Sequence, residues 1–312
     1  MTGMLYELTI GPFVAMAEFP LFFIEVLVGG LLSGVMYSLV ALGFVLIFKA
    51  SGVFNFAQGA MVLFAALFFA GFMDMGMPVL VALVLTIGVM VLLAYSIERV
   101  VLRPLVNQPH IILFMATIGI TFFIDGLGQQ IWGSGIRSIE IGLPKQPINF
   151  GEVQINAFDI ISAFAAGLLV AGLALFFQYT RIGRALRAVA DDHQAALSVG
   201  IPLQTIWVIV WTVAGIVALV AGIIWGSKLG VQFSLAMVAL KALPVLILGG
   251  FTSIPGAIIG GLIIGAGEKL GEVYWGTALG GGIEEWFAYM LALGFLLFRP
   301  QGLFGEKIIE RV

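Results

Sequence analysis

The chain of 312 residues has little charge and no cysteine. Asp, Glu, Lys and Arg make up 10% of it, whereas a soluble globular domain carries about 25% because its surface must stay wet. This composition excludes a soluble enzyme, a nucleic-acid-binding protein and a disordered chain. Without cysteine there is no disulfide framework and no thiolate metal site. The net charge of −3 is too small to indicate a strongly charged partner.

Sequence motifs for catalysis are also missing. The chain has no G-x-x-x-x-G-K-[ST] loop for nucleotide phosphates, no H-E-x-x-H zinc motif and no G-x-S-x-G nucleophile motif. Its two histidines, His110 and His193, are far apart in sequence. We therefore expect no enzymatic activity and no bound cofactor or metal. A channel, a transporter, a receptor or a scaffold remains.

Apolar residues dominate instead, at 61% of the chain, with a mean hydropathy of +1.15. A helix needs about 20 apolar residues to cross a hydrocarbon core of about 30 Å. Nine apolar stretches, some of them short, lie at residues 22–48, 57–72, 78–97, 111–131, 158–177, 205–225, 235–251, 255–269 and 285–298. We predict an all-α, polytopic α-helical membrane protein with about 8–10 transmembrane helices, some short or broken. We expect a single transmembrane domain over residues 1–312.

The positive charges orient these stretches, because cytoplasmic loops are enriched in Lys and Arg. With nine alternating spans, one side holds Lys49, Arg99, Arg103, Arg181, Arg184, Arg187, Arg299, Lys307 and Arg311. The other side holds only Arg137, Lys145 and Lys228. We therefore expect the N-terminus outside and the C-terminus in the cytoplasm. The first 20 residues contain no Lys or Arg and do not resemble a secretory signal.

The largest cytoplasmic loop, about 178–204, carries the pattern of a polar helix from Gly183 to Val199. Gly200 suits the end of that helix, and Pro202 follows it. Two interpretations of this helix compete. Its arginines hold the loop at anionic lipid headgroups, or the helix docks onto a cytoplasmic partner.

Residues Gln194–Gly200, QAALSVG, resemble the E-A-A-x-x-x-G loop of ABC importer permeases, with Gln in place of Glu. Further segments resemble the branched-chain amino acid ABC transporter permeases of the LivH type and follow in the same order along nearly the whole chain. They are Gly34–Gly43 (GVMYSLVALG), Asn55–Gly59 (NFAQG), Ser96–Leu105 (SIERVVLRPL), Arg181–Ala188 (RIGRALRA), Leu248–Gly261 (LGGFTSIPGAIIGG) and Pro300–Gly305 (PQGLFG). The sequence departs from the family at Ala60, where many members have an acid, and no family motif occurs in residues 132–157.

The resemblance implies a permease subunit of a binding-protein-dependent ABC importer in the bacterial inner membrane. It would translocate leucine, isoleucine, valine or related small polar solutes. Its implied partners are two cytoplasmic ATPase subunits, a second permease (a similar chain or a copy of itself) and a soluble solute-binding protein outside. The implied ATPase-coupling residues are Arg181, Gly183, Arg184, Arg187, Asp191, Asp192, Gln194, Ala195, Ala196 and Gly200. The alternatives are a urea or short-amide importer and, from another class, a stand-alone secondary transporter or channel.

Three polar residues near predicted spans are candidates for the substrate path. Asn55 and Gln58 lie at a break between two apolar stretches, and such breaks mark the substrate route in many transporters. The alternative is an interfacial turn facing water. Asp125 could accept the ammonium of an amino acid, or it holds the fold by pairing with Lys241 or a backbone group, or it lies near the outer interface.

Two further expectations concern packing and the outer surface. We expect Glu268, with Lys269, Glu272, Glu284 and Glu285, to form the outer face. Small-residue pairs four apart predict close helix packing: Gly30 with Gly34, Gly222 with Gly226, Gly256 with Gly260, and Gly261 with Gly265.

Overall fold

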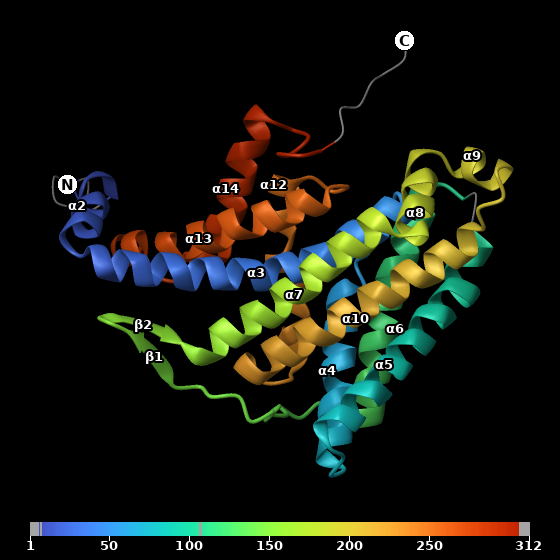
Figure 1. Cartoon of the computed structure of the whole chain (residues 1–312), viewed down its shortest axis with the longest axis horizontal. Helices are drawn as coiled ribbons and strands as arrows, with labels where there is room; N and C mark the ends of the chain where they lie inside the picture. Colours follow the sequence, from blue (N-terminus) through green and yellow to red (C-terminus); the bar gives the residue numbers. More distant parts are fainter. Residues whose placement is uncertain (1–5, 7, 106–107, 306–312) are drawn as a thin grey trace. The chain divides into compact units, whose positions relative to one another are not determined.

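The computed structural model describes residues 6, 8–105 and 108–305, and these residues are mostly helical (Figure 1). The elements in chain order are α2 (Gly11–Glu18), α3 (Pro20–Ser51), α4 (Gln58–Asp74), α5 (Val79–Ser96), the π-helix η1 (Ile97–Leu102), the 3-10 helix η2 (Arg103–Leu105), α6 (His110–Trp132), β1 (Pro147–Phe150), β2 (Val153–Asn156), α7 (Ala157–Tyr179), α8 (Arg181–Asp191), α9 (His193–Ser198), α10 (Leu203–Leu229), the 3-10 helix η3 (Phe233–Met237), α11 (Val238–Lys241), α12 (Leu243–Gly249), α13 (Ile254–Leu279) and α14 (Glu284–Phe298). The predicted polytopic helical membrane fold is confirmed.

Six helices within the described residues are long and apolar enough to cross a membrane. They are α3, α5 with its continuation to Leu105, α6, α7, α10 and α13. The three remaining predicted stretches are shorter or broken. Residues 57–72 fall in the 17-residue α4, residues 285–298 in the 15-residue α14, and residues 235–251 divide among η3, α11 and α12. The predicted short and broken segments are therefore present.

The chain forms two compact units, each assembled from separate sequence segments. Unit 1 comprises Met1–Ser38, Leu143–Leu168 and Lys241–Val312, and unit 2 comprises Leu39–Gly142 and Leu169–Leu240. Helices α3 and α7 therefore contribute residues to both units. The single transmembrane domain over residues 1–312 stays a prediction.

Helix α4 is the centre of unit 2. Most of its residues are buried, and it contacts α10, α6, α5 and η3. Small residues allow the close approach: a Cβ built on Gly222 of α10 would lie 2.7 Å from the carbonyl oxygen of Val62 on α4. A short apolar helix can occupy this position because its neighbours, rather than lipid, cover it.

In unit 1, glycines bring α3 and α13 into backbone contact. A Cβ built on Gly30 would lie 2.7 Å from the carbonyl oxygen of Gly265, and one on Gly34 would collide with the backbone of Gly261. The predicted close packing at these glycines is confirmed. Helices α12, α13 and α14 contact one another in the same unit. The strands β1 and β2 form an antiparallel hairpin, in which Pro147 pairs with Asn156.

Candidate functional site

The segment α8–α9, predicted to be the cytoplasmic coupling region, begins where α7 ends. The Thr180 hydroxyl accepts a hydrogen bond of 3.2 Å from the Gly183 backbone N–H and caps α8. Gly183 is buried against the end of α7, and a Cβ at this position would collide with the Phe177 backbone. Only glycine permits this tight corner.

Two arginines of α8 hold the carbonyl end of α7. Nη1 of Arg187 donates to the Phe177 carbonyl at 2.7 Å, and its Nη2 donates to the Gln178 carbonyl at 3.3 Å. Nη1 of Arg184 donates to the Tyr179 carbonyl at 3.3 Å. The last carbonyls of a helix lack intrahelical partners and carry partial negative charge. These arginines therefore tie α8 to α7.

The predicted single helix over 183–199 is two helices, because Asp192 interrupts it. Asp192 has an extended backbone, and its Oδ1 accepts hydrogen bonds from the N–H groups of Gln194 (2.8 Å) and Ala195 (3.0 Å). Gly200 ends α9 with φ +84°, which is the conformation that favours glycine.

The remaining predicted coupling residues differ in exposure. Ala196 is buried, whereas the exposed positions are Arg181, Arg184, Asp191, Asp192, Gln194, Ala195 and Gly200. Two apolar side chains of this segment also face outward, with Leu197 52% and Val199 74% exposed.

The start of α10, directly after α9, is tied to the rest of unit 2. The Arg103 guanidinium donates to the Gln204 side-chain oxygen, and the Trp207 indole N–H donates to the Ala50 carbonyl at 3.1 Å. The α8–α9 segment is thus held at both of its ends, by α7 and through α10.

The candidate path residues Asn55 and Gln58 are both fully buried within unit 2. The Asn55 Oδ1 accepts from the Ala57 N–H at 3.0 Å, so it stabilises the turn before α4. The Gln58 amide donates to the Ala214 carbonyl at 3.4 Å, and its Oε1 is buried without a hydrogen-bond partner among the described residues. Neither side chain has the exposure that an interfacial turn facing water would give it.

Asp125 lies apart from this turn. The turn that carries Asn55 and Gln58 contacts α6 at Thr117, whose hydroxyl accepts a hydrogen bond from the Phe56 N–H. Asp125 follows Thr117 by eight residues on α6, so the two residues are about 12 Å apart along the helix. Asp125 is half-buried, and its Oδ1 is buried without a hydrogen-bond partner in the part of the chain that the structure describes. The alternative partner considered for it, Lys241, belongs to unit 1 and is paired there with two glutamates.

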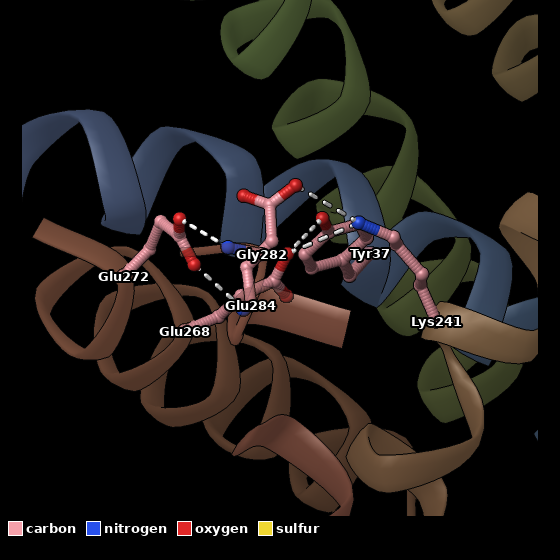
Figure 2. A network of polar contacts seen from close by, with 6 residues as sticks. All are labelled: Tyr37, Lys241, Glu268, Glu272, Gly282 and Glu284. Carbon is pink, nitrogen blue, oxygen red and sulfur yellow. Dashed lines mark hydrogen bonds and ion pairs between the residues drawn. The ribbon is translucent and has the colours of Figure 1, made fainter. Parts of the chain in front are cut away.

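A polar cluster lies within unit 1, formed by Tyr37, Lys241, Glu268 and Glu284 (Figure 2). The Tyr37 hydroxyl donates to Oε1 of Glu268 at 3.0 Å. Nζ of Lys241 lies 3.4 Å from the same oxygen and 3.6 Å from Oε1 of Glu284. Glu268 is 5% exposed. The prediction that Glu268 forms an outer face is therefore wrong, because α13 continues past residue 269 to Leu279 and carries Glu268 near its middle.

Glu272 positions the start of α14 beside this cluster. Its two carboxylate oxygens accept from the N–H groups of Gly282 and Glu284, each at 2.9 Å. The intervening turn has positive φ at Gly280, Gly281 and Gly282. Figure 2 shows Glu272 bonding these backbone groups while the Glu284 side chain points toward Lys241. In residues 6, 8–105 and 108–305, no group of three or more His, Cys, Asp or Glu side chains is arranged to hold a metal ion.

Comparison with known proteins identifies the family of this chain. The family model described as "Branched-chain amino acid transport system / permease component" matches residues 26–299. The chain belongs to this permease family. Since the family consists of transport components and six helices are apolar enough to cross a membrane, the permease is a multi-pass inner-membrane protein.

Three relatives match the permease along nearly their whole length. The high-affinity branched-chain amino acid transport system permease protein BraD of Pseudomonas aeruginosa is 31% identical over 306 residues, which cover 93% of this chain and 98% of BraD. The corresponding LivH protein of Escherichia coli (strain K12) is 30% identical over 317 residues, covering 95% and 100%. The probable LivH of Methanocaldococcus jannaschii is 28% identical over 298 residues, covering 90% and 92%.

The sequence identified some of the permease's notable residues and missed others. It named Lys241 as a possible partner of Asp125 and expected Glu268 on the outer face, but it did not bring these two residues together with Tyr37. A tyrosine within a long apolar run carries no signal of its own, and its contact with Glu268 joins residues 231 positions apart.

Proposed function

We propose that this permease is the membrane subunit of an ATP-driven importer of branched-chain amino acids. A soluble binding protein delivers the substrate outside, two ATPase subunits bind the cytoplasmic side, and a second permease completes the pathway. The N-terminus lies outside and the C-terminus in the cytoplasm. The observation that carries the proposal is the α8–α9 segment, a firmly anchored pair of helices with an exposed surface, in a chain whose relatives are named as amino-acid permeases.

In this proposal, ATP binding closes the ATPase subunits and moves α8–α9. The arginines that bond the α7 carbonyls and the Arg103–Gln204 contact transmit this movement to α7 and α10. The exposed side chains of Leu197 and Val199 supply an apolar docking surface at the C-terminal end of α9. The permease itself performs no covalent chemistry.

Reconstitution of the permease with its cognate partners tests the function. Proteoliposomes containing both permeases, the ATPase subunits and the binding protein are expected to accumulate radiolabelled leucine only when ATP is hydrolysed. Uptake of leucine by the permease alone would instead indicate a secondary transporter or channel. Uptake of urea or short amides without leucine would indicate the other importer class.

Substitution of Val199, directly after α9, tests the docking surface. Val199→Asp is expected to reduce recovery of the ATPase subunits with the permease and to lower uptake, because a charge desolvated in an apolar contact is costly. Ile136→Asp is the matched control, since Ile136 is also 74% exposed but lies in the predicted outer loop. Full ATPase recovery with Val199→Asp would remove α9 from the proposed interface.

We also propose that Asn55, Gln58 and Asp125 contribute to the substrate path. The unpartnered Oε1 of Gln58 and Oδ1 of Asp125 support this proposal, because buried polar atoms are ordinarily hydrogen-bonded and a bound ligand is one way to satisfy an exception. Loss of leucine uptake in Gln58→Ala or Asp125→Asn, at matched membrane abundance, is the expected outcome. Unchanged uptake in all three single variants, including Asn55→Ala, would contradict it.

A further inference from the structure

The polar cluster of unit 1 lies at membrane depth. Glu268 follows Ile254 by 14 residues and precedes Leu279 by 11, so it is about 21 Å from one end of α13 and about 17 Å from the other. Tyr37 is likewise well inside the 32-residue α3. With a hydrocarbon core of about 30 Å, both side chains fall within the apolar layer.

The cluster is not electrically balanced. One ammonium, that of Lys241, faces two carboxylates, those of Glu268 and Glu284. Its separations of 3.4 and 3.6 Å exceed the 2.7–2.9 Å typical of tight charge-assisted hydrogen bonds. The ammonium of a bound ligand would neutralise the excess negative charge. A carboxylate of the same ligand could pair with the Lys241 ammonium, which the two glutamates hold only loosely.

Part of the cluster is accessible. The side chains of Lys241 and Glu284 are 30% and 36% exposed, whereas that of Glu268 is 6% exposed. Charged groups at membrane depth do not face lipid; they face the protein interior or a water-filled space. Lys241 also ends α11, where the apolar segment of residues 233–249 is interrupted before α12, and such breaks are tolerated where they line a cavity.

The two glutamates of the cluster, Glu268 and Glu284, are each held by a residue other than Lys241. Tyr37 positions the Glu268 carboxylate, and Glu272 positions the backbone of Glu284. Figure 2 shows the Tyr37 hydroxyl and the Lys241 ammonium side by side at the Glu268 carboxylate, and Glu272 on the side of Glu284 away from Lys241. The carboxylates are thus pre-organised, which lowers the entropic cost of binding a ligand between them.

We propose that Lys241, Glu268 and Glu284 form a subsite for the two charged groups of a zwitterionic amino acid on its way through the permease. Lys241 binds the substrate carboxylate, and Glu284, backed by Glu268, binds its ammonium. Tyr37 and Glu272 are positioning residues. This inference rests on the proposed function and adds to it where the substrate's charges are bound. A purely structural ion-pair cluster is the other outcome of the test.

Photolabelling of the assembled importer tests the subsite. The probe is a diazirine analogue of leucine that keeps both charged groups, applied to proteoliposomes of the complete complex during turnover and followed by peptide mapping. The expected result is labelling that unlabelled leucine suppresses, concentrated on peptides from residues 238–284 and around Tyr37. In Lys241→Met this labelling is expected to fall at least about tenfold, equivalent to about 1.4 kcal/mol of binding free energy. Arg137→Gln, which removes the cation of the Arg137–Asp74 pair in unit 2, is expected to label as the unaltered permease does.

The outcomes separate the inference from the function on which it rests. Leucine uptake with labelling only outside these peptides overturns the subsite and leaves the function standing. Undiminished labelling in an assembled Lys241→Met complex overturns it as well and indicates a structural cluster. If the Lys241→Met complex does not assemble, the labelled peptides of the unaltered complex decide whether the subsite exists: labelling of residues 238–284 supports it, and labelling only elsewhere overturns it. Absence of ATP-dependent leucine uptake by the unaltered complex overturns both.

Discussion

The two charged regions of the permease use their charges differently. In α8–α9, charged side chains bond to backbone groups at helix ends, as Arg187 does to the Phe177 carbonyl and Asp192 to the Gln194 N–H. In the unit 1 cluster, Lys241 pairs instead with the side chains of Glu268 and Glu284. Water can replace a lost partner at an exposed helix end, whereas the Glu268 carboxylate, 5% exposed, is buried away from solvent, where an unpaired charge is costly. Substitutions in the cluster should therefore have the larger effects.

The largest loss of stability is expected at the backbone contact between α3 and α13, which brings Tyr37 to Glu268. Gly34→Leu places a side chain against the Gly261 backbone, which separates α3 from α13 and takes Tyr37 away from Glu268. We expect a loss of about 4 kcal/mol or more, the range reached by severe overpacking, and no recovery of folded permease by size-exclusion chromatography in detergent. Gly29→Leu is the control on the same helix, because a Cβ at Gly29 meets no atom within 4 Å. Equal recovery of both variants would contradict the close packing.

Removal of one carboxylate tests the cluster without disturbing the packing. Glu284→Gln keeps the size of the side chain but removes its charge beside Lys241. Leucine uptake by the reconstituted importer is expected to fall about tenfold, equivalent to about 1.4 kcal/mol. The neighbouring Glu285→Gln, at an exposed position, is expected to transport normally. Equal uptake in the two variants would show that charge at Glu284 plays no part in transport.

A substitution in α8 gives the smaller effect expected for a helix-end bond. Arg187→Gln removes two hydrogen bonds to the carbonyls of Phe177 and Gln178 and is expected to destabilise the α7–α8 corner by about 1–3 kcal/mol. Faster hydrogen exchange in residues 177–190, measured by mass spectrometry, is the expected observation. Arg181→Gln should leave this exchange unchanged, since Arg181 is exposed. Identical exchange in both variants would contradict the role of Arg187.

The smallest effect is expected at the partly exposed pair Arg137–Asp74 in unit 2. Exposed ion pairs contribute about 0–1 kcal/mol because solvent screens them. Arg137 also donates a hydrogen bond to the Trp132 carbonyl at the end of α6, so Arg137→Gln should lower the melting temperature of the purified permease modestly and leave leucine uptake unchanged. A marked loss of leucine uptake would show that the ion pair of unit 2 matters for transport as much as the cluster of unit 1 does.

Long apolar runs made the membrane fold predictable, because about 20 such residues suffice to identify a span. The end of α13 was not predictable in this way. Glu268, Lys269 and Glu272 look like the polar end of a span, yet the helix continues to Leu279. Glu268 is tolerated there because Tyr37 and Lys241 pair with it, and these partners are distant in sequence.

The coupling segment was predicted more closely, since its signals are local. Gly200 ends α9 as its position before Pro202 indicates. The interruption at Asp192 was missed, although an Asp that caps the following residues is a recognisable helix start. The burial of Asn55 and Gln58 could not be predicted, because it depends on how α10 and α3 pack against α4 in unit 2.

The most direct test of a role for the cluster in transport compares two variants that each remove one cation from an ion pair. Leucine uptake is measured in proteoliposomes of the complete importer at matched permease content, with Lys241→Met set against Arg137→Gln. We predict that Lys241→Met reduces uptake at least about tenfold, that Lys241→Arg restores a substantial part of it, and that Arg137→Gln transports as the unaltered permease does. Equal uptake by Lys241→Met and Arg137→Gln would contradict the account.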